Sequence, residues 1–533
     1  MFKRNALILT VLIVLLVSFA LFAFLIKKDK YVFHKEVTTK KILVKNLLGI
    51  NGFEWDVLQD PNEPAVGSRV YEPKFDLLKS FGLFRHYIDW EKLEDKPGNY
   101  SFNPTWRGSW NYDVVYERFK QEGTLVLACI KNSPDWLHKT YPADEQDAEN
   151  LPLTYGSERG APKSYLAMAK VAFQFAARYG SNKNVAPSLL SVNSTLRWNG
   201  DTPNEVKVGL NTVKYIECNN EPDKWWKGKK AEQTASEYAA NLSAFYDGHM
   251  GKLGANAGVK NADPNMVVVM AGLAAPDTAY VSQIVEWCRK NRGYKKNGDI
   301  NLCFDVVNYH LYANNNEDLI QKLLKDKRGV APELSKQGKI ADDFIAVTKK
   351  IAKNMEVWVT EAGYDVHESS PQKAIAIGEK SELITQADWM VRSSLLFARH
   401  GIDKVFYYIL NDVNFTGGLY GSSGFVVDGR KRPVADYFYQ LKNLMGNYQY
   451  LQTLNTDPLV DVYMLGDKKM FALCIPDEVG RTQLYKLALK GHQKAIIYYL
   501  KAGTDKMEEK TVNVINGFLT VNVTETPMFI QGI

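Results

Sequence analysis

From about residue 45 to residue 445, short apolar runs alternate with segments whose apolar residues recur every three or four positions. The runs have few polar interruptions, which is typical of strands buried on both faces of a parallel sheet. Eight of them are predicted to be strands, at residues 47–52, 83–88, 124–131, 213–218, 266–273, 304–310, 357–361 and 404–410. The alternation predicts a series of βα units.

Helical periodicity fills the segments between these strands. Pro162 precedes one such segment, in which Leu166, Ala169, Phe173 and Ala176 share one face. Helices are predicted at residues 163–179, 231–253, 278–291, 340–354 and 373–400, with a long insertion at 181–211. The pattern predicts an α/β fold, a (β/α)8 TIM barrel that occupies residues 31–445 as the catalytic domain.

The pattern changes near residue 446. Helical periodicity fades there, and short alternating runs separated by glycines continue to residue 533. These runs lie at residues 461–465, 470–475, 482–488, 495–500, 511–515 and 518–523. Residues 446–533 are therefore predicted to form an antiparallel β-sandwich accessory domain beside the barrel.

The N-terminal 30 residues are predicted to be a signal anchor. Residues 6–26 carry no charge and only two polar side chains, Thr10 and Ser18, and a helix of this length spans about 30 Å, the thickness of a bilayer core. A cleaved signal peptide is the alternative, but cleavage after Ala20 would leave six apolar residues on the mature chain. We expect an extracytoplasmic protein, periplasmic or at the cell surface, held to the membrane by this helix, or secreted if the segment is cleaved.

Charge and cysteine content narrow the possible functions. The net charge is +6, but residues 1–30 hold five basic residues and one acidic residue, which leaves 61 basic and 59 acidic residues in the other 503. The folded part is thus nearly neutral, and no nucleic-acid partner is predicted. The five cysteines show no metal-ligand spacing, so neither a metal nor another cofactor is predicted. The sequence predicts no oligomeric state.

Two predicted strands end in glutamates that could carry chemistry. The fourth strand runs into Asn220-Glu221-Pro222, and the seventh ends at Glu361, with Gly363 behind it. The functional face of a TIM barrel lies at the carboxyl ends of its strands. Two carboxylates facing each other there suit glycosidic cleavage, in which one donates a proton and the other attacks the anomeric carbon; in a retaining enzyme they lie about 5–5.5 Å apart. The alternative is that each is a solvated loop acid.

These motifs resemble those of clan A glycoside hydrolases, with families 39 and 5 the most similar, and the resemblance extends over about residues 45–533. It implies that Glu221 is the general acid/base, that Glu361 is the nucleophile and that Asn220 contacts the sugar 2-hydroxyl. Two features depart from the pattern. The eighth strand lacks the Trp found in many clan members, and Ala362 follows the second Glu where family 39 usually has an aromatic residue.

Further candidate site residues come from the same strand ends. His310 and Tyr312 match the clan's His-x-Tyr, and alternation along a strand sends both to one side. Arg85 resembles the clan's strand-two arginine, which would keep Glu361 ionised, although a structural ion pair is the alternative. Six tryptophans fall in predicted rim loops, where aromatic faces suit sugars. Of these, Trp136, Trp225 and Trp226 are the predicted substrate-binding residues, and Trp55, Trp90 and Trp198 are the others.

The sequence therefore predicts a retaining glycoside hydrolase that cleaves β-glycosidic bonds of oligo- or polysaccharides. The alternative is a catalytically inactive barrel that binds glycans as a surface carbohydrate receptor. A metal-dependent hydrolase is disfavoured because the chain has only eight histidines and no His-x-His motif. The sequence does not identify the sugar, the linkage, or endo versus exo action.

Overall fold

The structure is a computed structural model that describes residues 40–63, 67–199, 201–315, 327–413 and 419–533. No helix within these ranges is both long enough and apolar enough to cross a bilayer. The membrane segment predicted at residues 6–26 lies outside the described residues.

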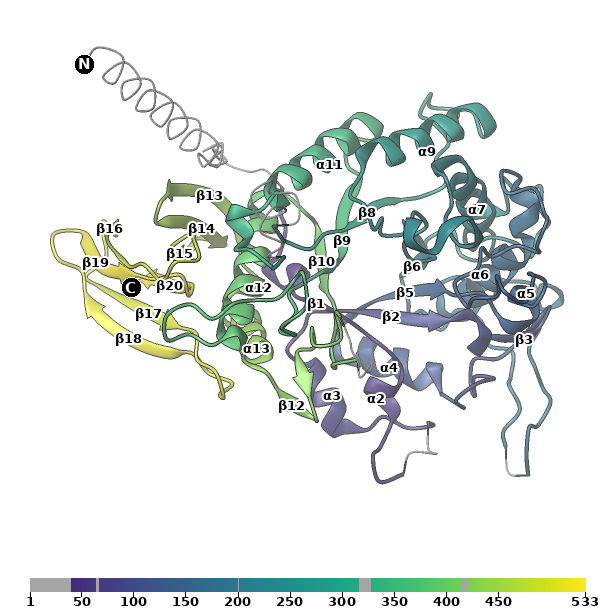
Figure 1. Ribbon diagram of the computed structural model, residues 1–533, viewed down its shortest axis with the longest axis horizontal. Helices are drawn as coiled ribbons and strands as arrows, with labels where there is room; N and C mark the ends of the chain where they lie inside the picture. Colours follow the sequence, from purple (N-terminus) through teal and green to yellow (C-terminus); the bar gives the residue numbers. More distant parts are fainter. Residues whose placement is uncertain (1–39, 64–66, 200, 316–326, 414–418) are drawn as a thin grey trace, which may run out of the picture.

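Eight parallel strands close into a barrel in the order β1-β10-β9-β8-β7-β6-β5-β2 (Figure 1). Every predicted barrel strand is present, so the predicted (β/α)8 barrel is confirmed. The strands are β1 (Gly49–Gly52), β2 (Leu83–Asp89), β5 (Leu125–Lys131), β6 (Tyr215–Cys218), β7 (Val267–Met270), β8 (Val306–His310), β9 (Glu356–Ala362) and β10 (Lys404–Tyr407).

A helix follows each barrel strand and packs on the outside of the barrel (Figure 1). These helices are α3 (Glu72–Leu78), α4 (Tyr112–Glu122), α6 (Leu166–Tyr179), α7 (Ala235–Asp247), α9 (Thr278–Asn291), α11 (Gln337–Ile351), α12 (Glu382–Arg399) and α13 (Pro433–Met445).

Two predicted helices are shorter in the structure than the periodicity suggests. Helix α7 begins after its N-cap Thr234, which forms a capping box with Glu237, and ends before Gly248, whose φ of 63° lies in the left-handed region. Helix α12 begins only at Glu382, because residues 373–381 belong to the loop after β9, where the Ala374 N–H donates to the Asp365 carbonyl at 2.8 Å.

Inside the barrel, side chains form layers of different chemistry. An apolar layer fills the end where the strands begin, with Leu83, Leu127, Val306, Trp358 and Phe406 all buried. Further along the strands the interior becomes polar: Asn51, Arg85, Glu217, Asn308 and Thr360 are each fully buried. This buried polar layer lies next to the carboxyl ends of the strands, where a TIM barrel carries its functional groups.

The C-terminal part is built from antiparallel strands, as predicted. A six-stranded sheet has the order β13-β14-β15-β20-β17-β18, and β16 (Gln483–Ala488) pairs with β19 (Phe518–Val523) in a second sheet. A buried cluster that includes Val462, Leu473, Leu487 and Val521 joins the two sheets. The six-stranded sheet contains β13 (Gln449–Thr456), β14 (Leu459–Leu465), β15 (Lys468–Cys474), β20 (Met528–Gly532), β17 (Lys494–Tyr499) and β18 (Glu508–Asn513).

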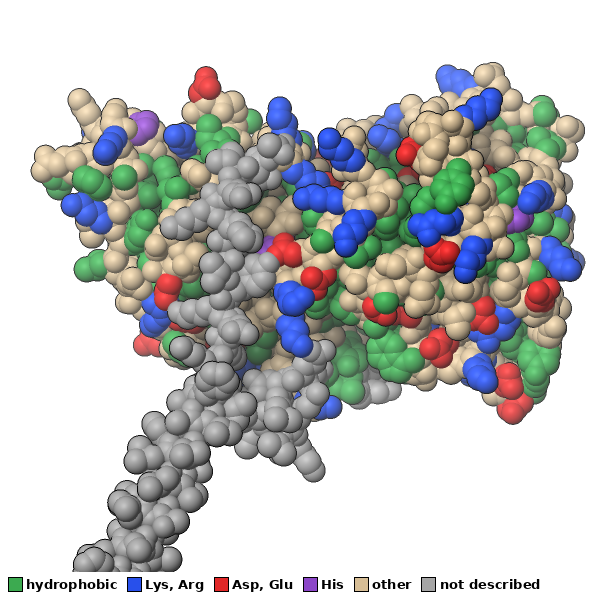
Figure 2. Space-filling view, turned by 90° about the horizontal axis from the view of Figure 1, so that it is seen from above, with side chains coloured by type: hydrophobic (Ala, Val, Ile, Leu, Met, Phe, Trp, Pro, Cys, Tyr) green, Lys and Arg blue, Asp and Glu red, His purple; other side chains and the backbone are tan. Residues whose placement is uncertain are grey.

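Buried ion pairs connect this β-domain to the barrel through α12. Arg399 on α12 binds Asp461 on β14 at 2.5 Å, and both side chains are only 1% exposed. Arg392, about two helical turns earlier, binds Glu333 at 2.6 Å and donates to the carbonyl of Asp477 at 3.0 Å. Figure 2 shows one face of the molecule, on which both basic and acidic side chains are exposed.

Removal of one partner of the interface ion pair should destabilise the protein. Asp461→Asn leaves the Arg399 guanidinium buried with a weakened counter-charge, and we expect the free energy of unfolding to fall by about 3 kcal/mol in urea titrations. Asp343→Asn serves as the control: it breaks the exposed pair with Lys339, 2.6 Å long on α11, and should cost less than about 1 kcal/mol. Equal effects of the two variants would contradict this account of the interface.

Candidate active site

Glu361, the penultimate residue of strand β9, lies among donors from strand β2 and from the segment just after β8. Its Oε1 accepts hydrogen bonds from the Tyr87 hydroxyl and, at 3.1 Å, from Nη1 of Arg85. Its Oε2 accepts from the Tyr312 hydroxyl at 3.0 Å. Burial alone would raise the pKa of Glu361, but the positive charges of His310 and Arg85 and the two tyrosine donors outweigh it and lower the pKa. Glu361 is therefore held as a carboxylate.

An irregularity in strand pairing directs Glu361 into the barrel. Strand β9 pairs with β8 at Tyr309–Val359 and then at His310–Glu361, so the register shifts by one residue between these pairs. Thr360 already points inward, where its hydroxyl accepts from Asn308 at 2.8 Å. Because of the shift, the adjacent Glu361 also contacts interior groups, which strict alternation would forbid.

Glu221 lies on the turn that follows β6. Asn219 and Glu221 both have positive φ, 70° and 48°. A Glu rarely adopts this conformation, and here the turn is fixed because the Glu221 N–H donates to the Gly272 carbonyl at 3.2 Å. The strained turn places the Glu221 carboxyl at the carboxyl end of the barrel, with 19% of the side chain exposed.

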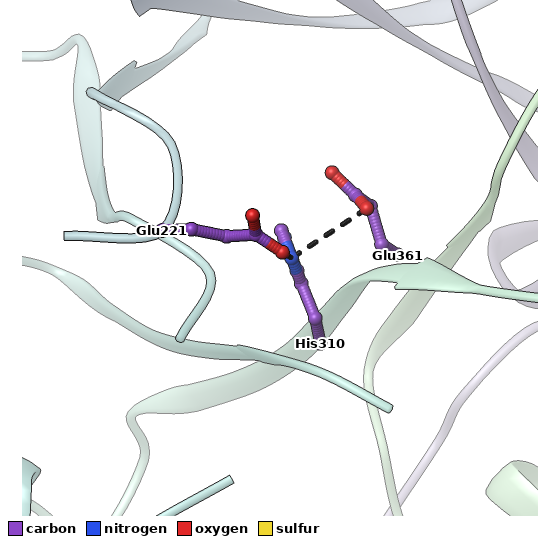
Figure 3. Close-up of side chains that lie close together, drawn as sticks. All are labelled: Glu221, His310 and Glu361. Atoms are coloured by element: carbon purple, nitrogen blue, oxygen red, sulfur yellow. Dashed lines mark hydrogen bonds and ion pairs between the residues drawn. The ribbon is translucent and has the colours of Figure 1, made fainter. Parts of the chain in front are cut away.

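His310 lies between the two glutamates (Figure 3). Its Nδ1 is 2.8 Å from Oε1 of Glu221 and 3.6 Å from Oε2 of Glu361, while Nε2 is 3.1 Å from the Thr360 hydroxyl. Burial lowers the pKa of His310, but the charges of Glu361 and Glu221 raise it further than burial lowers it. His310 thus connects the two carboxyl groups electrostatically.

The pKa of Glu221 is shifted in the direction opposite to that of Glu361. Burial is the largest cause and raises the pKa of Glu221, and the negative charge of Glu361 raises it further, although the hydrogen bond from His310 opposes both. One oxygen of Glu221 and one of Glu361 lie within 4.8 Å of each other. The pair therefore combines a carboxyl whose pKa is raised with one whose pKa is lowered, at a separation close to that of retaining glycosidases, about 5–5.5 Å.

The same three residues, Glu221, His310 and Glu361, also form a group that could ligate a metal ion. The environment fits a metal poorly, because the Arg85 guanidinium lies 3.1 Å from Glu361 and both oxygens of that carboxylate already accept hydrogen bonds. A cation would have to bind beside this fixed positive charge.

Arg85 organises the layer beneath the pair. Its Nε and Nη2 bind both oxygens of Glu217 at 2.7 and 3.1 Å, and its Nη1 donates to Asn51 at 2.9 Å. Nη2 also donates to Oδ1 of Asn220 at 2.7 Å. Arg85 itself is fully buried, so it positions other groups and does not form an exposed part of the site.

The structure thus brings together six of the nine predicted site residues: Glu221, Glu361, Asn220, Arg85, His310 and Tyr312. Oδ1 of Asn220 is held by Arg85, and within the described part of the chain its amide nitrogen has no hydrogen-bond partner. The Asn220 amide can therefore still donate to a ligand hydroxyl.

The predicted tryptophans are not all equivalent. Trp225 and Trp226 are 59% and 52% exposed and pack edge to face with ring centroids 4.9 Å apart. Trp136 is half-buried, donates to the Glu94 carbonyl at 3.3 Å and lines a cavity of about 390 Å³ with Pro97 and Leu153. Trp90 is wrong as a rim candidate: it is fully buried, with its indole N–H donating to Glu94 at 2.7 Å.

Four interior residues of the site escaped the sequence analysis, namely Tyr87, Glu217, Asn308 and Thr360. Tyr87 is two residues after Arg85, and alternation along β2 could have placed it on the same face. Glu217 lies inside a strand that otherwise reads as apolar, and this buried charge was the available signal. Asn308 donates to Glu217 at 2.9 Å and to Thr360 at 2.8 Å.

Comparisons with models of known protein families give no match, and no curated protein is similar in sequence. Solved structures do match over most of the chain. A family 39 glycoside hydrolase from Bacteroides cellulosilyticus WH2 is 15% identical, with 92% of this chain and 82% of that chain covered and a TM-score of 0.61.

Enzymes of other families give similar results. A family 30 endoxylanase from Clostridium papyrosolvens C71 is 14% identical, with a TM-score of 0.52 and coverage of 93% of this chain and 99% of that chain. A family 51 α-L-arabinofuranosidase from Bifidobacterium longum is 12% identical, with a TM-score of 0.51 and coverage of 93% and 97%. The likeness that the strand-end motifs predict is confirmed for the architecture: this chain has the fold of clan A glycoside hydrolases.

Proposed function

We propose that the protein is a retaining glycoside hydrolase that cleaves β-glycosidic bonds in oligo- or polysaccharides. The observation that carries this proposal is the pair Glu221 and Glu361, whose oxygens approach within 4.8 Å and whose pKa values are shifted in opposite directions. A protonated acid beside an ionised nucleophile is the arrangement that double displacement at an anomeric carbon requires.

In the first step, an oxygen of the Glu361 carboxylate attacks the anomeric carbon and forms a glycosyl ester. The Glu221 carboxyl donates its proton to the glycosidic oxygen, and the C–O bond to the leaving sugar breaks. In the second step, Glu221, now a carboxylate, takes a proton from water, whose oxygen attacks the anomeric carbon and releases Glu361.

The surrounding residues prepare the two carboxyl groups for these steps. Arg85, Tyr87 and Tyr312 hold Glu361 ionised and oriented before the sugar binds, so little reorganisation is needed during attack. The charge on Glu221 changes between the two steps. Because Nδ1 of His310 contacts Oε1 of Glu221, His310 can gain or release a proton in response to this change. The amide N–H of Asn220 is available for the sugar 2-hydroxyl, the contact that the resemblance to clan A implies.

Substitution of the two glutamates tests the assignment. Glu361→Ala removes the nucleophile and should lower kcat by at least about 10⁴-fold, while Glu221→Gln removes the proton donor and should lower it by about 10²–10⁴-fold on natural glycosides. Dinitrophenyl glycosides need no protonation of the leaving group, so Glu221→Gln should form the glycosyl-enzyme on them at close to the wild-type rate. The measurement is burst-phase kinetics on a panel of aryl β-glycosides and polysaccharides.

Glu356→Gln is the matched control, because Glu356 begins the same strand β9 and pairs with Lys404 at the end of the strand opposite to Glu361. It should leave kcat near wild type. Full activity of Glu361→Ala would refute the assignment. The alternative, a glycan receptor without catalysis, predicts calorimetric binding of oligosaccharides with no reducing ends released over days.

The pH dependence of kcat/KM should be bell-shaped. Activity needs ionised Glu361, whose lowered pKa extends the acid limb to lower pH, and protonated Glu221, whose raised pKa extends the alkaline limb to higher pH. Tyr87→Phe removes one donor to Glu361 and should move the acid limb to higher pH. Tyr309→Phe is the control, because the Tyr309 hydroxyl on β8 has no hydrogen-bond partner among the described residues and its ring stacks on Phe344. An unchanged acid limb in Tyr87→Phe would contradict the role of Tyr87.

We also propose that the protein acts outside the cytoplasm, held by the apolar segment at residues 6–26. Expression of the full chain and of a chain that starts at residue 31 compares the two directly. The full chain should sediment with membranes and be degraded by protease added from outside, whereas the shortened chain should remain in the soluble cytosolic fraction. Equal soluble fractions for both chains would contradict the proposed anchor.

A further inference from the structure

Lys224, three residues after Glu221, carries a buried charge that is poorly compensated. The residue is only 3% exposed, and within the described residues its ammonium donates no hydrogen bond. Its ion pair with Glu149 is 3.9 Å long, beyond hydrogen-bond distance. Nζ of Lys224 is not among the fully enclosed polar atoms that lack a partner in the described residues, so the ammonium keeps an open side on which an acceptor could bind.

The carboxylates nearby serve other lysines. Glu149 lies 3.0 Å from Lys227, and Asp147 lies 3.0 Å from Lys227 and 3.5 Å from Lys230. Lys131, another cation close to Lys224, is paired with Asp89 at 2.7 Å. Within the described residues, Lys224 is therefore the cation of this group whose counter-charge is the most distant, because it shares Glu149 with Lys227 and lies 3.9 Å from it.

The backbone around Lys224 is fixed next to the acid/base. The Asp223 carboxylate accepts the N–H groups of Ala274 and Ala275 at 2.9 and 2.8 Å, and the Pro222 carbonyl accepts from Gln233 at 2.7 Å. These bonds anchor the segment to the loop after β7 and to the residues before α7. The charges of Lys224 and Glu221 act on each other: Lys224 lowers the pKa of Glu221, against the larger effect of burial.

The same segment continues directly into the exposed pair Trp225 and Trp226. A sugar could stack on an aromatic face here while its charged substituent reaches the ammonium. Because Glu221 protonates the leaving oxygen, the segment that carries Glu221 and Lys224 faces the sugar that departs, on the side away from Glu361.

We propose that Lys224 forms an anion-binding subsite for the leaving sugar, so that the enzyme prefers acidic glycans. The anion is a carboxylate of a uronic acid or a sulfate ester, both of which offer oxygen acceptors to an ammonium. This inference rests on the proposed hydrolase function, from which it takes the direction of the leaving group.

Binding tests the subsite without turnover. Calorimetry on the full chain carrying Glu361→Ala compares methyl β-glucuronide with methyl β-glucoside, and methyl β-galactoside 6-sulfate with methyl β-galactoside. The anionic member of at least one pair should bind at least about tenfold more tightly, and the pair that shows the difference identifies the anion. Equal affinities within both pairs would overturn the proposal, and this comparison does not depend on whether a Lys224 variant folds.

Variants assign the effect to Lys224. Lys224→Met should remove the tenfold preference and leave the affinity for the neutral sugar unchanged, and Lys224→Arg should keep most of the preference. The matched control is Lys229→Met, an exposed lysine in the same segment, which should keep it fully. If Lys224→Met weakened neutral and anionic sugars equally, Lys224 would be a structural residue and the proposal would fail.

Hydrolysis separates this proposal from the proposed function. Suitable substrates are a glucuronic-acid-bearing xylan with its carboxyl-reduced form, and a sulfated galactan with its desulfated form. At least about tenfold higher kcat/KM on one acidic polymer, lost in Lys224→Met, would support both proposals. Equal cleavage of both forms would overturn the subsite and leave the hydrolase standing. Anion binding through Lys224 with no cleavage of any polymer or aryl glycoside would overturn the hydrolase but support an anion-binding subsite.

Discussion

The contact between Arg85 and Glu217 is the interaction on which the site depends. Both side chains are fully buried inside the barrel, and they form a bidentate pair between strands β2 and β6. A buried ion pair contributes stability only when further hydrogen bonds satisfy both partners. Here those bonds reach Asn51, Asn308, the Gly272 N–H and Asn220, so the charges that stabilise each other also join four strands of the barrel.

The remaining capacity of Arg85 is directed upward to Glu361. Because Glu217 neutralises much of the guanidinium charge, Arg85 can remain buried in the barrel interior even when no substrate is bound. Its Nη1 still donates a hydrogen bond to the Glu361 carboxylate. Within the described residues Glu221 has no arginine in contact, and its carboxyl is hydrogen-bonded to His310, so burial is the largest influence on its pKa. The opposite pKa shifts of the two glutamates are thus set by the buried residues beneath each of them. The substrate does not need to contact these residues.

The sequence was most informative where one physical rule acts alone. All eight barrel strands could be predicted because strands buried on both faces are apolar throughout, and Glu221 and Glu361 could be found because they follow such strands. The register shift that turns Glu361 inward leaves no mark on the sequence, since it arises from pairing with β8 and β10.

Trp90 is a residue whose burial the sequence analysis did not predict. Its position in a loop suggested exposure, but its ring is buried edge to face against Trp136 and its indole N–H donates to Glu94. Strand β13 was missed because its half-exposed residues alternate weakly and it borders α13.

The charged interface between α12 and β14 has a consequence for how the chain can be divided. Helix α12 directly follows the strand and loop that carry Glu361, and Arg399, its last residue, is buried in an ion pair with Asp461 of the β-domain. A β-domain that served merely as a tethered module would meet the barrel through a hydrated surface and a flexible linker. In this protein the two parts share ionised groups that neither could bury alone, so they form a single cooperative unit, and recombination with relatives must exchange α12 and the β-domain together.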